Sequence, residues 1–216
     1  MTTGTAQSSE RPLRADARRN HQRLLTEARI AFTRCGTEVA LEEVARRAGV
    51  GVGTLYRHFP SRQALMAAVF QDEVDSLLAR SEELLKADRP CRALIDWLRA
   101  IIGHTSTYRG LSLALIGAAD DEASGLSHCC RTMHAAGGAL LERAQRTGAV
   151  RPEIDIDDLM RLTKAIALAV EETPEDPGVA DRLLMLAVTG LLVDRGPGHP
   201  ALRSSPAQVG DPATAR

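Results

Sequence analysis

Arginine side chains, whose guanidinium groups bind phosphate well, gather at one end of this 216-residue chain. Residues 10–62 hold eleven Arg and six acidic residues, a charge of +5, whereas residues 63–216 hold 16 basic and 22 acidic residues, a charge of −6. The total of −1 therefore hides a basic head and an acidic body. Such asymmetry is expected when one small domain contacts a polyanion and the rest does not. Chance clustering of solvated helix faces is the alternative.

A second set of side chains could line a ligand site in the acidic body. An apolar stripe at spacings of three and four residues carries the only two aromatic residues beyond residue 70 and one His: Leu94, Trp97, Ile101, His104 and Tyr108. Residues of later helices could lie opposite: Leu111, Leu115, Leu126, Cys130, Met133 and Gly137. We predict a mostly aliphatic cavity there, with these ligand contacts: Trp97, Ile101, His104, Tyr108 and Met133. An ordinary helical core face is the alternative.

The cysteines and histidines offer a weaker candidate site. Cys130 and His134 are four residues apart in HCCRTMH (128–134), but a metal ion would need two more ligands, so we expect no metal and no other cofactor. Four cysteines in this arrangement do not make a disulfide framework, which indicates a reducing compartment. A redox-active pair at Cys129 and Cys130 stays open as an alternative. No motif of hydrolytic or transfer chemistry is present, and we expect no enzyme.

Almost every periodic segment predicts a helix, so the expected fold is all-α. Helices are predicted at 14–35, 41–48, 52–59, 62–86, 91–108, 110–118, 122–147, 155–172 and 178–194. Gly36, Gly49 and Pro60 end the first three, and Ser61 can cap the fourth. Residues 1–12 are small and polar, and residues 196–216 are rich in Pro and Gly, so both segments are expected to be disordered.

The two short helices at 41–48 and 52–59 predict a helix-turn-helix. They are joined by Ala-Gly-Val-Gly at 48–51, where Gly49 permits a left-handed turn and Val50 fills the corner. Leu55 and Phe59 are expected in the core, which leaves Arg57 and His58 on other faces. In this motif the second helix enters the DNA major groove, and its first residues face the base edges.

The longer string VALEEVARRAGVGVGTLYRHFPSRQAL (39–65), preceded by LLTEARIAFTRCG (24–36), resembles the TetR family of transcriptional regulators. The family pattern is an apolar-periodic helix ending at Gly, then I/V-A-x-x-A-G-V, then G-T-L-Y-x-H-F, then Ser and a basic residue. The specific resemblance covers residues 24–69, and TGAVRP (147–152) before IDDL is similar to the family's C-terminal part. It implies a three-helix DNA-binding domain at 13–61 and a helical effector-binding and dimerisation domain at 62–195.

The resemblance implies DNA contacts at seven residues: Val52, Gly53, Thr54, Tyr56, Arg57, His58 and Arg62. The first three begin the recognition helix, where side chains reach bases and backbone N–H groups meet phosphate. Tyr56 and His58 match residues that bind backbone phosphates, and Arg57 lies where a variable, base-reading side chain sits. Arg62 stands where the family has a phosphate-binding Lys. Ala40 and Gly51 stand where the family commonly has Thr and Ser, so two helix-capping hydroxyls are missing.

The resemblance further implies a homodimer through the last two helices, which would place two recognition helices on successive turns of a palindromic, double-stranded DNA operator. A close-packing face at three-and-four spacing supports this: Leu183, Leu184, Ala187, Gly190 and Leu191. A core face within the chain is the alternative. We therefore expect a ligand-responsive homodimeric repressor, released from its operator by a small apolar or amphipathic effector. The alternative is an all-helical small-molecule or thiol-sensing protein whose head no longer reads DNA.

No segment of the sequence predicts a membrane partner. The N-terminus has no apolar stretch that could serve as a signal-peptide core, and no run of 18 or more apolar residues occurs. We expect a soluble, cytoplasmic protein.

Overall fold

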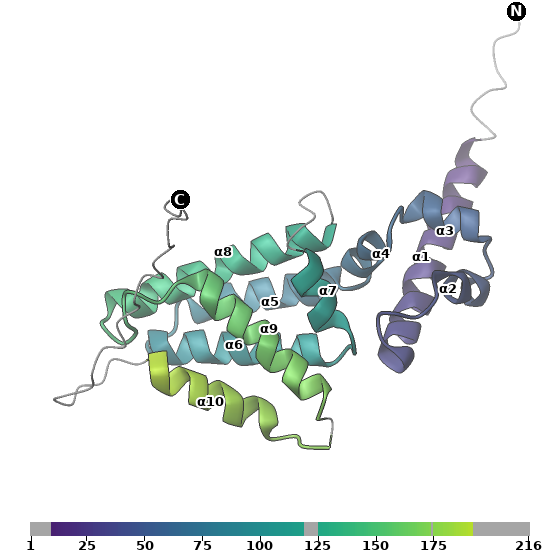
Figure 1. Cartoon of the computed structure of the whole chain (residues 1–216). Helices are drawn as coiled ribbons and strands as arrows, with labels where there is room; N and C mark the ends of the chain where they lie inside the picture. Colours follow the sequence, from purple (N-terminus) through teal and green to yellow (C-terminus); the bar gives the residue numbers. More distant parts are fainter. Residues whose placement is uncertain (1–9, 119–124, 174, 192–216) are drawn as a thin grey trace, which may run out of the picture.

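The computed structural model describes residues 10–118, 125–173 and 175–191, and every regular element there is an α-helix. The helices, drawn in Figure 1, are α1 (Glu10–Cys35), α2 (Leu41–Ala48), α3 (Val52–His58), α4 (Arg62–Val69), α5 (Gln71–Leu84), α6 (Pro90–Ser106), α7 (Leu111–Gly117), α8 (Gly125–Arg146), α9 (Ile156–Glu171) and α10 (Val179–Leu191). The all-α prediction is confirmed. None of the described helices has the length and hydropathy needed to cross a membrane.

Helices α1, α2 and α3 form the head, on the right of Figure 1, and their apolar core continues through α4 to Tyr108 and to Leu111 of α7. Leu24, Phe32 and Leu55 are fully buried in that core, because each helix turns one apolar face toward the other two. Gly49 adopts the left-handed conformation (φ 66°, ψ 35°) between α2 and α3, and Val50 N–H donates to Ala45 O over 3.0 Å. The predicted helix-turn-helix corner is present as expected.

The predicted helix at 62–86 is wrong as a single element, because it is broken at Phe70. There φ is −94° and ψ is 4°, so α4 ends and α5 begins at that residue. The Phe70 ring is buried, with its centroid 6.0 Å from the Phe32 ring of α1 and 4.5 Å from the Tyr108 ring that follows α6. Apolar residues continue through the break, so periodicity alone could not reveal it.

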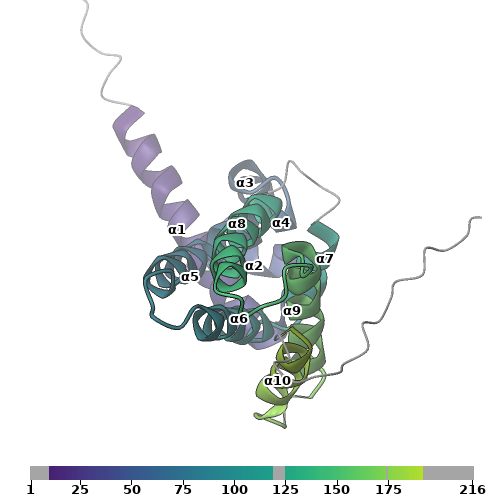
Figure 2. The same cartoon turned by 90° about the vertical axis from the view of Figure 1, so that its left-hand side faces the viewer.

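The body is built around α6, which packs against α5, α8, α9 and α10. Its core holds Trp97 and Leu98 from α6, Leu140 from α8 and Ala167 from α9. Helix α10 lies at the outer edge of the body in Figure 2. Helix α4 contacts both α1 of the head and α8 of the body and so connects the two parts.

Two further expectations need correction. Helix α1 begins at Glu10, so residues 10–12 are helical rather than disordered; residues 1–9 and 196–216 lie outside the described residues. On α10, Leu184 is buried in the chain's own core, and Leu183 and Ala187 pack against that core, because α10 turns this stripe toward α6 and α9. Gly190 and Leu191, the rest of that predicted dimer face, lie outside the described side chains.

Candidate nucleic-acid interface and ligand cavity

Helix α3 presents most of the predicted DNA contacts to solvent. Tyr56 is 43% exposed, Val52, Gly53 and Arg57 are also exposed, and Thr54 and His58 are half-buried. Leu55, between them in sequence, is fully buried and anchors the helix to the head. Cβ atoms built on Gly51 and Gly53 would meet nothing within 4 Å, so the start of α3 is open to an approaching partner.

Arg57 lies folded back on its own helix. Its Nη2 donates to Thr54 Oγ1 over 2.9 Å, and its Nε donates to Gly53 O over 3.2 Å. The side chains of Arg57 and Thr54, both predicted to reach bases, are therefore already paired with each other. A guanidinium has five N–H donors in a planar fork, so Arg57 keeps donors for a base edge or a phosphate even in this conformation.

His58 faces α1 as well as solvent. Its ring centroid is 5.5 Å from that of His21, and the His21 ring stacks on Phe59 at 4.9 Å. Burial, and then the neighbouring His58, lower the pKa of His21. His21 could not be identified from the sequence, because a lone His on a long helix carries no signal until its partner is known.

Arg62 has a structural role that was not predicted. Its Nη1 donates to the carbonyl oxygens of Thr37 (2.5 Å) and Val39 (2.7 Å), which ties the α1–α2 loop to the first turn of α4. Ser61 caps the same helix by accepting from Ala64 N–H over 3.1 Å, as predicted. Ala40 and Gly51 make no side-chain cap, as their types require.

Part of the basic charge of the head is neutralised within α2. Hydrogen bonds from Arg46 and Arg47 to Glu43, of 2.7–2.8 Å, lower the pKa of Glu43 to about 2. Glu43 is therefore ionised at neutral pH and holds both guanidinium groups on the surface of α2. The α3 face and Arg62 are the better candidates for phosphate contact.

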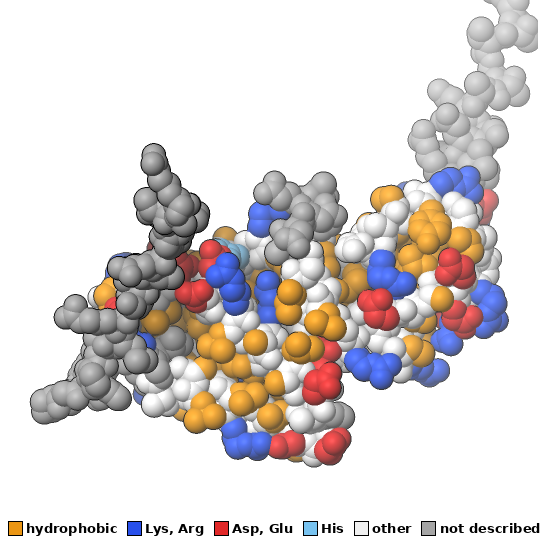
Figure 3. Space-filling view, in the orientation of Figure 1, with side chains coloured by type: hydrophobic (Ala, Val, Ile, Leu, Met, Phe, Trp, Pro, Cys, Tyr) orange, Lys and Arg blue, Asp and Glu red, His pale blue; other side chains and the backbone are white. Residues whose placement is uncertain are grey.

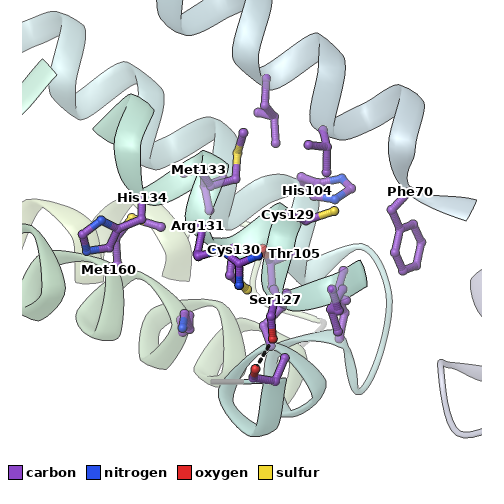
Figure 4. A pocket seen from close by; sticks show the side chains of 18 of the residues that line it. Phe70, His104, Thr105, Ser127, Cys129, Cys130, Arg131, Met133, His134 and Met160 are labelled. Atoms are coloured by element: carbon purple, nitrogen blue, oxygen red, sulfur yellow. Dashed lines mark hydrogen bonds between the residues drawn. The ribbon is translucent and has the colours of Figure 1, made fainter. Parts of the chain in front are cut away.

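A cavity of about 660 Å³ lies in the body beside α4. Its wall is mostly apolar and is lined by Ala67, Phe70, Val74, Leu77, Ile101, His104, Thr105, Leu111, Leu115, Ala118, Leu126, Ser127, Cys129, Cys130, Arg131, Met133, His134, Ala135, Asp157, Met160 and Lys164. Figure 4 shows Phe70 and His104 at one end, and His134 and Met160 at the other. Its volume is typical of small-molecule sites.

Three of the five predicted ligand contacts line this cavity, namely Ile101, His104 and Met133, whereas Trp97 and Tyr108 do not. Trp97 is fully buried against α8, where a Cβ on Gly137 would lie 2.6 Å from Cζ3. Tyr108 lies between head and body, and its hydroxyl donates to Glu73 Oε1 over 3.4 Å. The shared helical face predicted all five, but α6 is about 25 Å long, so that face meets different neighbours along its length.

His104 connects the cavity to the junction of head and body. Its ring lies 6.0 Å from Phe70 and 5.9 Å from Tyr108, and burial lowers its pKa while Glu73 opposes that shift. Glu73 Oε1 accepts from Arg29 Nη1 of α1 over 2.8 Å, and its buried Oε2 has no hydrogen-bond partner. His104 contacts Tyr108, and Tyr108 is hydrogen-bonded to Glu73, which pairs with Arg29 of the head. These side chains form a continuous path from the cavity to the head.

A second junction joins the α6–α7 turn to the head. Thr37 N–H donates to Arg109 O over 2.9 Å, and Arg109 Nη2 donates to Cys35 O over 3.1 Å. Glu171 of α9 holds the same turn by accepting from Gly110 N–H (2.7 Å) and Ser112 N–H (3.2 Å). Leu111, the first residue of α7 after this turn, lines the cavity, so the turn lies between the cavity and the head.

The two adjacent cysteines line the cavity as free thiols. Burial raises the pKa of both Cys129 and Cys130, which disfavours the reactive thiolate. Among the residues that the structure describes, no group of three or more His, Cys, Asp or Glu side chains could hold a metal ion.

Two family profiles match this sequence. The profile described as "Bacterial regulatory proteins, tetR family" covers residues 24–69, and that described as "Transcriptional regulator SbtR-like, C-terminal domain" covers residues 89–193. A curated relative, the HTH-type transcriptional regulator SAR0097 of Staphylococcus aureus (strain MRSA252), is 34% identical over 82 residues. That match spans 37% of this chain and 42% of the relative, so less than half of the relative's length is represented.

Solved structures resemble the chain over a longer span. The TetR transcriptional regulator SCO0520 from Streptomyces coelicolor is 32% identical over 80% of this chain and 98% of its own, with a TM-score of 0.53. A TetR transcription regulatory protein from Mycobacterium vanbaalenii is 36% identical over 84% of this chain and 100% of its own, with a TM-score of 0.50. Thermus thermophilus FadR, solved with lauroyl-CoA, shares the fold at 19% identity, 83% and 99% coverage and a TM-score of 0.59.

Proposed function

Because this chain belongs to the TetR family of transcriptional regulators, and is a DNA-binding regulator, we propose that it acts as a homodimeric repressor that a small ligand releases from its operator. The observation that carries the proposal is the position of the cavity: Ala67 of α4 and Phe70 at its end form part of the cavity wall. The first residue of α4, Arg62, is hydrogen-bonded to the α1–α2 loop of the head.

Helix α4 therefore connects the ligand cavity to the DNA-binding head. A ligand that holds Ala67 and Phe70 in one position favours one orientation of the head, and through it one spacing of two recognition helices. A ligand shifts such an equilibrium only when it binds one state better than the other. The two recognition helices of a dimer must lie about 34–36 Å apart to enter successive major grooves, so a modest rotation of each head weakens binding.

The DNA contacts that we propose are those of α3 and the start of α4: Val52, Gly53, Thr54, Tyr56, Arg57, His58 and Arg62. The exposure of Val52, Gly53, Tyr56 and Arg57, in contrast to the buried Leu55, supports this assignment. The operator would be a palindrome, because a two-fold symmetric dimer presents two identical helices. The site of action would be the cytoplasm, where chromosomal DNA of bacteria lies.

The dimer surface that we propose is formed by α9 and α10. Met185 and Leu186 of α10 are 49% and 73% exposed, and Leu162 of the neighbouring helix α9 is 38% exposed. Figure 3 shows apolar side chains gathered over this side of the body. An exposed apolar surface of this kind usually marks an interaction site, and the last two helices are those implied by the family.

A small apolar or amphipathic molecule is the proposed effector. The mostly apolar cavity wall with His104, Thr105 and Lys164 at intervals supports this class. FadR, whose solved complex holds lauroyl-CoA, has the same fold, which is consistent with a ligand in the body of this chain.

Fluorescence anisotropy with labelled duplexes tests the proposal. We expect the protein to prefer DNA from upstream of its own coding sequence over a random duplex, and to lose at least about 100-fold in affinity between about 50 and 200 mM salt, because phosphate contacts release counterions. Equal affinity for both duplexes, or binding that does not change with salt, would contradict a sequence-specific DNA-binding role for the head.

A further inference from the structure

Lys164 of α9 lines the cavity without a partner of its own. Its side chain makes no hydrogen bond and no ion pair with any residue that the structure describes, although it belongs to the cavity wall. The chain uses 25 Arg but only two Lys, Lys86 and Lys164, so this ammonium is also chemically distinct from nearly every other cation of the protein. A half-buried ammonium beside apolar groups is stabilised by a bound anion.

Among the described residues of the cavity wall, two cationic side chains, Lys164 and Arg131, outnumber one carboxylate, so this part of the wall has a net positive charge. Asp157, the one carboxylate among the residues described as lining the cavity, is already paired, with its Oδ1 2.6 Å from His134 Nε2. Burial raises the pKa of the Cys130 thiol, while Lys164 and Arg131 lower it through their charges. Cys130 is therefore neutral at physiological pH and does not balance the charge of Lys164.

Most of the rest of the cavity wall is apolar. Leu77, Ile101, Leu111 and Leu115 come from three helices and line it without any hydrogen-bonding group. Met160 lies one turn before Lys164 on α9 and also lines the cavity, so the ammonium borders directly on apolar wall. A ligand that fills this volume needs an apolar body, and one that reaches Lys164 needs a negative end.

We propose that the ligand of this cavity is an amphipathic monoanion, whose carboxylate or similar end group binds the Lys164 ammonium beside Arg131 and whose apolar body lies along α5, α6 and α7. This assignment rests on the proposed ligand-responsive function and names its effector class. A neutral ligand leaves the ammonium unpaired, and a cationic one is repelled by it, so the cavity discriminates by charge as well as by shape.

Three probes of equal chain length test the assignment: decanoate, decan-1-ol and decyltrimethylammonium, titrated by calorimetry into the full chain. We expect decanoate to bind at least about 10-fold more tightly than either of the others, a difference equivalent to about 1.4 kcal/mol. Lys164→Met should abolish this preference while decan-1-ol binding persists, and Lys164→Arg should retain it. Lys86→Met removes the same charge from an exposed site outside the cavity and should change nothing.

A second readout reports contact directly. Reductive ¹³C-methylation labels the two lysines and the α-amino group, and the Lys164 signal is assigned as the one absent from Lys164→Arg. Decanoate should shift this signal and leave that of Lys86 in place. Any of four results overturns the proposal. Decan-1-ol binds as tightly as decanoate, the preference for decanoate survives in Lys164→Met, decanoate does not bind, or the Lys164 signal does not move.

DNA release is measured separately, by adding each probe to the protein–operator complex. If decanoate binds at Lys164 without releasing DNA, the result supports the anion site and contradicts the ligand-responsive function. If decan-1-ol releases DNA as well as decanoate does, the result supports the ligand-responsive function and contradicts the preference for an anion.

Discussion

At the scale of single residues, a hydrogen bond from Arg57 to Thr54 joins two of the proposed DNA contacts on α3. Their pairing keeps the Arg57 side chain along the helix before DNA is bound. A pre-positioned guanidinium loses less conformational entropy when it meets a base, which favours a role in specificity.

We predict that Arg57→Ala relaxes sequence preference. The free-energy difference between operator and random duplex should fall by about 1–3 kcal/mol, because a bidentate contact with a base edge is lost. Anisotropy titrations of both duplexes measure this difference. Arg80→Ala, which removes an exposed guanidinium from the body, is the matched control and should leave it unchanged.

Arg62→Ala provides the contrast, since it should weaken binding to all duplexes alike. It should also lower the unfolding temperature, because the carbonyl groups of Thr37 and Val39 lose their donor. If Arg57→Ala weakens both duplexes equally while Arg62→Ala relaxes preference, the assignment of base and phosphate contacts is reversed.

His21 and His104 make stability depend on pH. Burial lowers both pKa values below 6.5 in the folded state, so the unfolded chain binds more protons as the pH falls through that value. The free energy of unfolding should therefore be fully retained above about pH 7 and should fall toward pH 5. Urea unfolding at both pH values measures the loss.

His104→Gln should reduce that loss, because the variant has no group to protonate at the buried site. His128→Gln is the matched control, since His128 is exposed on α8, and it should leave the pH dependence as it is in the parent. A pH dependence that is identical in all three proteins would show that His104 does not titrate differently in the folded and unfolded chains.

At the scale of the elements, the packing of α6 against α8 depends on one glycine. A Cβ on Gly137 would lie 2.6 Å from Trp97 Cζ3, 2.9 Å from Cη2 and 3.0 Å from Ile156 Cδ1, whereas one on the adjacent Gly138 would meet nothing within 4 Å. The Trp97 ring is fully buried, and protein cores are close-packed, so a side chain added beside it strains the contact.

Gly137→Ala should therefore lower the free energy of unfolding by about 1–3 kcal/mol through overpacking. Gly138→Ala, in the same turn of α8, should raise it by up to about 1 kcal/mol, because alanine favours the helix and meets no neighbour. Chemical denaturation of the two variants measures both effects. Equal stability of the two proteins would contradict the close contact between Gly137 and Trp97.

At Phe70 the chain forms two helices, α4 and α5, where the apolar periodicity predicts a single helix. The helical pattern of α4 continues into α5, yet the ring of Phe70 is buried among Phe32, His104 and Tyr108, from the head and the body. Contact with both parts requires the chain to bend there. The result is a short α4 that links the cavity to the head.

At the scale of the whole molecule, α10 leaves Met185 and Leu186 uncovered by the residues that the structure describes. We predict that Leu186→Glu shifts the protein from dimer to monomer, because a carboxylate would be buried in the proposed interface. Light scattering after size-exclusion chromatography measures the mass. Ile30→Glu places the same charge at an exposed apolar position of α1, and should leave the dimer intact.

A Leu186→Glu protein that keeps the mass of a dimer would exclude the face around Leu186 as the interface. Where the variant is monomeric, its affinity for a full palindrome should fall toward that of a single half-site, since the two heads are no longer coupled. That measurement tests whether tight operator binding depends on dimerisation.

The head could be predicted from the sequence nearly in full. Gly49 at the turn, Ser61 at the cap and Leu55 in the core are local features, because each depends on neighbours within a few residues along the chain. The same short range explains why the helix-turn-helix string identifies the family. The helices of the body were also predicted, within a few residues at most ends.

Only the tertiary structure decided which neighbour each helix face meets. Periodicity placed Trp97, His104 and Tyr108 on one face, but they lie in the core, at the cavity and at the head junction, respectively. It likewise indicated a dimer face at Leu183, Leu184 and Ala187, which pack against the chain's own core. The spacing of side chains along a helix determines their common direction, whereas contacts between helices distant in sequence determine what lies in that direction.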